Sequence, residues 1–240
     1  ALADEGTGGG STDHNIAIGY QALTMGDVAS NDRNRQGNIA IGGFALNSTD
    51  DNATSGQIAI GHESLTALTT GTSNIAIGYQ TMRGHTTGVN NTVVGFQAMY
   101  DTDAGGNAKD SQDNVFIGYQ AGAGTWGNTG ASNYNVGVGS NVLDGGLDGA
   151  NSNTAMGYQA LTNLTTGDEN VAIGIYAGYT MAATSDCVLV GRNAGYNINN
   201  TDADGTVAIG YKAGENITSG QNNTIIGYQA GDAITDGDSS

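Results

Sequence analysis

Residues 15–23 read Asn-Ile-Ala-Ile-Gly-Tyr-Gln-Ala-Leu, and the first five of these residues recur along the chain in 12 exact or variant copies. The copies start at residues 15, 38, 57, 74, 91, 114, 135, 153, 170, 187, 206 and 223, so the shortest spacing is 17 residues. Spacings of up to 23 residues therefore contain insertions. A short repeat that fills a whole chain is typical of a solenoid, in which each repeat contacts only its neighbours.

The repeat unit is too short for helices and favours strands. Helical solenoids need two packed helices and about 33 residues or more per unit. In most copies two larger residues flank a small one, as with Ile16, Ala17 and Ile18, which indicates a short β-strand with two different faces. We expect the large residue before each glycine to point inward and to stack on its equivalents. This prediction concerns Ile18, Ile60, Ile117, Ile173 and Ile226.

The rest of each unit completes one coil. The glycine ends the strand where the chain must turn, a second short strand is predicted for the Tyr-Gln-Ala-Leu segment, and Thr-Thr-Gly, as at residues 69–71, forms another turn. The sequence thus predicts an all-β chain, a parallel β-solenoid or β-roll of about 12 short coils stacked at ~4.8 Å over roughly 55 Å. Residues 1–14 form a lead-in, residues 15–231 the solenoid, and residues 232–240 a tail or a link to a further region.

An asparagine column is predicted to join the coils. Nine of the 12 copies begin with Asn, and stacked amides can pass hydrogen bonds from one coil to the next. Gln57, Cys187 and Thr206 replace Asn but can still occupy the column. The predicted ladder consists of Asn15, Asn38, Asn74, Asn91, Asn114, Asn153, Asn170 and Asn223.

Composition restricts the function classes. Six Lys and Arg stand against 23 Asp and Glu, for a formal net charge of −17, and this charge repels nucleic acid and anionic membrane surfaces. Glycine, threonine or asparagine interrupts every apolar run before the roughly 20 residues of a membrane span, so no membrane insertion is expected. The chain starts at Ala1 without a signal peptide, which suggests a processed piece or a fragment.

The repeat resembles two groups of surface proteins. Asn-x-Ala-Ile-Gly-Tyr-Gln-Ala-Leu with Thr-Thr-Gly turns is similar to the head repeats of trimeric autotransporter adhesins, and more closely to repeats in fibre proteins of tailed bacteriophages. The resemblance covers about residues 15–231. It implies a parallel β-roll, side-by-side association of three chains, and an extracellular fibre that contacts a glycan or protein receptor on a cell surface.

Signals for catalysis are weak. The four glutamates are scattered over different units, whereas glycan cleavage needs two carboxyl groups held about 5 to 10 Å apart. The three histidines share no metal-ligand spacing, and no histidine lies at the level of Cys187 to activate its thiol. We therefore expect no enzyme and no cofactor, although a glycan-cleaving spike stays open as an alternative to a phage fibre or a bacterial adhesin.

Calcium is the one cofactor that the sequence allows. Asp101 and Asp103, and likewise Asp202 and Asp204, place hard oxygen ligands close together next to glycine-rich turns, but neither pair completes an EF-hand loop. Plain acidic loops are the alternative.

Receptor contacts are expected in the insertions. The insertion over residues 124–134 contains Trp126, the only tryptophan, and Tyr134. An exposed aromatic ring on a loop of a rigid scaffold can stack on a sugar. We therefore predict a receptor contact at Trp126 and Tyr134, with packing of Trp126 over the solenoid edge as the alternative.

Overall fold

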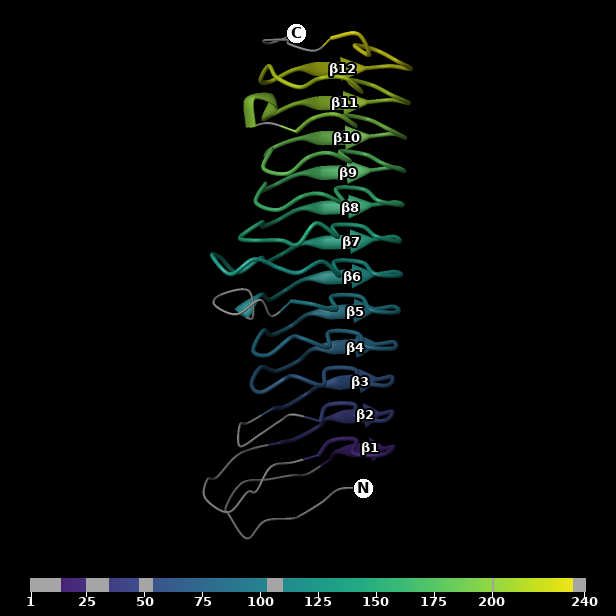
Figure 1. Ribbon diagram of the computed structural model, residues 1–240, viewed down its shortest axis with the longest axis vertical. Coiled ribbons are helices and arrows are strands. Elements are labelled where there is room, and N and C mark those ends of the chain that lie inside the picture. Colours follow the sequence, from purple (N-terminus) through teal and green to yellow (C-terminus); the bar gives the residue numbers. More distant parts are fainter. Residues whose placement is uncertain (1–13, 25–34, 48–53, 103–109, 200, 235–240) are drawn as a thin grey trace.

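The computed structural model describes residues 14–24, 35–47, 54–102, 110–199 and 201–234. These ranges contain 12 strands of three residues each and one short 3-10 segment, η2 (Thr201–Ala203). Figure 1 shows the strands stacked one above the next in chain order. The strands are β1 (Ile16–Ile18), β2 (Ile39–Ile41), β3 (Ile58–Ile60), β4 (Ile75–Ile77), β5 (Thr92–Val94), β6 (Val115–Ile117), β7 (Val136–Val138), β8 (Thr154–Met156), β9 (Val171–Ile173), β10 (Val188–Val190), β11 (Val207–Ile209) and β12 (Thr224–Ile226).

All described strands belong to one parallel sheet. Each strand pairs with the next strand in sequence, from β1 to β12, without a crossover. The register aligns equivalent residues, so that Ala17 lies beside Ala40 and Ala40 beside Ala59. The predicted parallel β-solenoid is confirmed. Each coil is named after its strand, and a column is the set of residues at one repeat position.

The predicted direction of the strand side chains is wrong. The middle residue of a strand points into the core, whereas the first and third residues point outward. Ala40 is fully buried, while the exposed fractions of Ile18 and Ile226 are 59% and 66%. Ile117 and Ile173 are also exposed, and Ile60 is half-buried. The core lies on the alanine side because the segment after each glycine returns across it, and in most coils this segment places a buried leucine or methionine there.

That returning segment is not a second strand. In the β1 coil the φ angles of Gln21 and Leu23 are 50° and 49°, and equivalent residues in other coils are also left-handed. The fold instead forms a turn whose backbone bonds join successive coils, as when Phe44 N donates to Tyr20 O and Leu23 N donates to Ala45 O. The left-handed backbone turns the Ala22 and Leu23 side chains into the core.

The corner glycine is required by close backbone contact. Gly95 has a φ of 142°, and a Cβ atom built on it would lie 2.1 Å from the carbonyl oxygen of Gly118 in the next coil. A real Cβ cannot approach a carbonyl oxygen so closely. The glycine column is therefore a condition for stacking the coils at strand spacing.

Larger core residues are accommodated by glycines opposite them. Phe116 takes the middle position of β6, where most strands have alanine, and its ring lies 2.9 Å and 2.7 Å from the Cβ positions that Gly122 and Gly137 would have. Trp126 packs edge-on against Phe116 with 5.9 Å between ring centroids. The insertion thus contributes one ring, Trp126, to an aromatic pair in the core.

Candidate interaction surfaces

The asparagine column is a buried amide ladder. Asn153 Oδ1 accepts hydrogen bonds from Asn170 N and Nδ2, both at 3.0 Å, and Asn153 Nδ2 donates to Asn135 Oδ1 at 3.0 Å. Backbone-to-amide bonds of the same kind connect every coil from β1 to β10. The ladder prediction is confirmed for these coils. Asn223 is buried as predicted and donates to Gly220 O within its own coil.

The substituted positions of the ladder behave differently. Gln57 keeps the pattern, because its Oε1 accepts from Asn74 N at 3.1 Å. Cys187 N still donates to Asn170 Oδ1, but its thiol offers only a weak acceptor to the next coil. Burial raises the pKa of the Cys187 thiol to about 12, which leaves the thiol protonated and unsuited to nucleophilic chemistry.

The outer face of the sheet is apolar along its whole described length. Its 24 outward positions, two in each of the 12 strands, hold Ile, Val or Thr except for Met156. None of these positions carries a charge, although the chain has a net charge of −17. Because the pattern persists over every strand, the outer face forms a continuous two-column stripe, which we call the sheet stripe.

An aromatic column borders the sheet stripe at the glycine corner. Stacked rings connect His62, Tyr79, Phe96 and Tyr119, with centroids 5.2 to 5.5 Å apart. Tyr20 and Phe44 continue the contacts edge-on. Stacking within the column leaves mainly ring edges toward solvent, so the exposed tyrosines extend the apolar surface around the corner.

Beside the rings runs a second, partly exposed ladder of side-chain amides. Gln80 donates to Glu63, Gln97 donates to Gln80 and Gln120 donates to Gln97, with donor–acceptor distances of 2.8 to 3.1 Å. The hydrogen bond from Gln80, followed by that from Arg83, holds the pKa of the Glu63 carboxyl below its usual range. The sequence repeat shows these glutamines plainly, but their coupling follows only from the left-handed turn.

The two predicted receptor residues have different environments. Trp126 is fully buried, and its indole Nε1 donates to Gly122 O at 2.9 Å. This placement contradicts the hypothesis that Trp126 contacts a receptor, because the indole is buried against Phe116 instead of facing solvent. Tyr134 is 57% exposed, so a receptor contact at Tyr134 stays a prediction.

The predicted calcium ligands already take part in loop contacts. Asp101 Oδ2 accepts a hydrogen bond from Thr125 at 2.7 Å, and Asp204 Oδ1 accepts from Ser185 N at 2.8 Å. Asp202 is exposed in η2, and Asp103 lies outside the described residues. Among the described residues, no three His, Cys, Asp or Glu side chains gather as metal ligands. Calcium binding stays an untested prediction.

Comparisons with known proteins give no relative. No family model, no curated protein and no solved structure matches the chain. Within the described ranges, none of the helical segments has the length and apolarity that crossing a bilayer requires.

Proposed function

We propose that the chain is a non-enzymatic segment of an extracellular fibre, of the tailed-phage type, in which three copies associate side by side and help attach the particle to a host surface. The observation that carries this proposal is the sheet stripe. An uncharged row of β-branched side chains along a whole solenoid far exceeds the scattered apolar residues of an ordinary protein surface.

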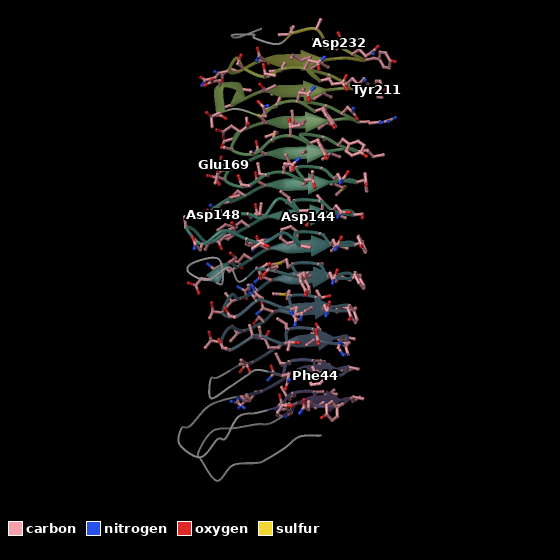
Figure 2. All side chains as sticks on the ribbon, viewed as in Figure 1. Phe44, Asp144, Asp148, Glu169, Tyr211 and Asp232 are labelled. Atoms are coloured by element: carbon pink, nitrogen blue, oxygen red, sulfur yellow. The ribbon has the colours of Figure 1, made fainter. Side chains whose placement is uncertain are left out.

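The energetics favour a second copy as the occupant of the stripe. Burial of apolar surface contributes about 25 cal/mol per Å², and the contribution repeats at every coil. The net charge of −17 opposes close approach of identical chains, but the stripe itself is free of charge. Association through this face therefore brings together apolar surfaces, while acidic loops such as those of Asp148 and Glu169, on the edge away from Tyr211, stay in solvent (Figure 2).

The resemblance of the repeat to fibre and adhesin repeats supports the same assembly and gives it an attachment role. The distribution of acidic groups also supports a non-enzymatic role. Glu63 lies in an ion pair with Arg83, and Glu215 lies in one with Lys212, at coils far apart on the fibre. Neither glutamate is part of a pair of carboxyl groups in which one is kept protonated for acid catalysis.

Sedimentation equilibrium tests the assembly. The chain is expected to sediment at about three times its mass of 24.1 kDa. Ile173→Lys places a charge in the middle of the sheet stripe without entering the core, since Ile173 points outward. This variant is expected to stay folded and to dissociate.

The matched control is Thr166→Lys, an exposed position in the turn that precedes β9. It adds the same charge to the preceding β8 coil but lies off the stripe, so it should leave the trimer intact. A parent chain that sediments as a monomer, or an Ile173→Lys variant that remains a trimer, would contradict the proposal.

A further inference from the structure

The repeat pattern changes on the outer edge of the β9 to β11 coils. In most coils the second residue after the corner glycine is Gln or Asn, but the β9 coil has Tyr176 there and the β11 coil has Lys212. The fifth residue after the glycine is Tyr179 in the β9 coil and Tyr196 in the β10 coil. Since identical coils provide identical surfaces, a specific contact requires positions that depart from the repeat.

Three tyrosines form a compact aromatic cluster at this edge. Tyr179 and Tyr196 stack with centroids 5.0 Å apart and planes within 9°. Tyr176 packs edge-on against both, at 5.4 and 6.1 Å. All three rings are half-buried, so packing fixes their orientation and leaves part of each ring accessible. Rigid tyrosines of this kind provide contact area at a low cost in conformational entropy.

Two cations flank the next ring. The Arg192 guanidinium carbon and Lys212 Nζ each lie 5.9 Å from the centroid of Tyr211. Lys212 is paired with Glu215 at 3.0 Å, and Glu215 also accepts a hydrogen bond from Asn193 at 3.1 Å. The local charge of Arg192, Lys212 and Glu215 is thus +1, on a chain whose net charge is −17.

Arg192 differs from the other cations of the described residues. Arg35 is buried, and Arg83 and Lys212 form ion pairs with glutamates. Arg192 is exposed, and within the described ranges its guanidinium has no carboxylate partner. A guanidinium held on a tyrosine ring can bind a carboxylate through two parallel hydrogen bonds.

We infer that Tyr176, Tyr179, Tyr196, Arg192 and Lys212 form a binding patch for a saccharide that carries a carboxylate, such as a uronic or sialic acid. The tyrosines offer apolar ring surface to the C–H groups of the sugar, and Arg192 pairs with its carboxylate. A long polyanion is disfavoured by the acidic remainder of the chain, so a carboxylate on a branch or at a chain end fits best.

The patch is compatible with the proposed trimer, and the inference rests on the attachment role in that proposal. Its tyrosines lie two to five residues past the corner glycine, outside the strands whose outer residues form the sheet stripe. Tyr211 lies on the edge away from Glu169 and Asp148 (Figure 2). Side-by-side contact through the stripe therefore leaves the tyrosine cluster accessible.

Binding of the whole chain to an array of immobilised oligosaccharides tests the patch. The array holds glycans that end in uronic or sialic acid, each beside the same glycan with its carboxyl group methyl-esterified. We expect binding to acidic members and at least a tenfold loss on esterification. Arg192→Gln should cause a similar loss, which corresponds to about 1.4 kcal/mol, whereas Tyr196→Ser should weaken binding by removing ring surface.

Matched variants separate recognition from folding. Tyr119→Ser removes an exposed tyrosine of the aromatic column away from the patch and should leave binding unchanged, and Tyr196→Phe should retain binding because the ring stays. Absence of binding to every acidic glycan, equal binding to the esters, or full binding by Arg192→Gln would overturn the inference. Sedimentation of the same samples reports the trimer independently, so a failed patch and a failed assembly give different results.

Discussion

The β1 to β4 coils and the β9 to β12 coils fill the same cross-section in two different ways. In the β1 to β4 coils the middle strand residue is alanine, and leucine or methionine stands four residues after the corner glycine. In the β9 to β12 coils that fourth position is always glycine, and larger core residues stand at Leu189 and Ile225 in the strands. Met181, Ile198, Ile217 and Ile234 add bulk after the turn, at a position that Leu68 also fills in the β3 coil. The two regions thus fill their cores from different repeat positions.

The two regions also differ in their polar interior. The buried amide ladder runs through the first region and reaches Cys187 N in the β10 coil, but Cys187 and Thr206 have no side-chain amide to pass it on. The sheet nevertheless continues through β12 with unchanged register. The corner glycines and the backbone bonds are therefore sufficient to propagate the fold, while the ladder and the leucine or methionine four residues after the corner glycine add stability locally.

The largest expected effect concerns the core positions that differ between the two regions. Leu189→Ala should lower the free energy of unfolding by about 3 kcal/mol, because it leaves a cavity beside Gly195. Gly195→Leu alone should also destabilise, since its Cβ would lie 2.7 Å from Leu189 Cδ2. The double variant restores the pattern of the first region, and the left-handed φ of 58° at Gly195 is one that leucines adopt in the β1 to β3 coils.

Urea unfolding of the two single variants and the double variant measures the coupling. The double variant should be less destabilised than the sum of the single variants by about 2 kcal/mol. If the destabilisations of the two single variants simply add in the double variant, a large residue at position 195 does not compensate for a small one at position 189. The proposed difference between the two regions would then be wrong.

Much of the fold could be predicted from sequence because the repeat fixes the register. The constant distance between the Asn and the Gly within each copy predicted the parallel stacking and the amide ladder. The alternation in Ile-Ala-Ile showed that the strand has two faces, but not which one faces the core. That choice depends on Leu23 and its equivalents, which reach the alanine side only because the backbone at Gln21 and Leu23 is left-handed. Residues other than glycine rarely adopt this left-handed backbone conformation, and no local sequence pattern indicates it.

The interaction surfaces were harder to predict for the same reason. The sequence left two expectations open for Trp126, a receptor contact or packing over the solenoid edge, and the structure buries the indole against Phe116. The sheet stripe follows from the correct strand direction and could not be identified without it. The tyrosine cluster has a sequence signal, namely the loss of Gln at position 176 and the paired Tyr179 and Tyr196 at the 17-residue spacing. That signal becomes meaningful only once the turn brings these positions to one edge.

A smaller effect is expected from the ladder. Asn153→Ala removes the acceptor of Asn170 N and Nδ2 in a buried environment, so it should destabilise by about 2 kcal/mol. Thr206→Val keeps the side-chain shape and loses only the hydrogen bond from Oγ1 to Ala203 O, so about 1 kcal/mol is expected. Urea unfolding measures both losses. If Asn153→Ala and Thr206→Val lower the free energy of unfolding equally, the ladder contributes no more than the polar contacts that replace it.

The smallest effect at neutral pH concerns Cys187, where the ladder ends. Desolvation is the main cause that raises the pKa of this thiol from 9.0 to about 12, against the amide hydrogen bonds of Thr206 and Gly205. The folded protein therefore holds the proton more tightly than the unfolded chain. The protonated thiol therefore contributes fully to stability below pH 9, and this contribution is lost as the pH rises from 9 toward 12.

Comparison with Cys187→Ala isolates this contribution, because the tyrosines and lysines titrate in both proteins. Between about pH 9 and pH 11 the parent should lose stability relative to the variant by roughly 1.4 kcal/mol per pH unit, measured by urea unfolding. A disulfide reagent at about pH 8, below the titration of the thiol, should modify the parent only at the rate of opening of the β10 coil. Rapid modification of the native chain would show that Cys187 is accessible, and that the end of the amide ladder is a loose point of the solenoid instead of a packed one.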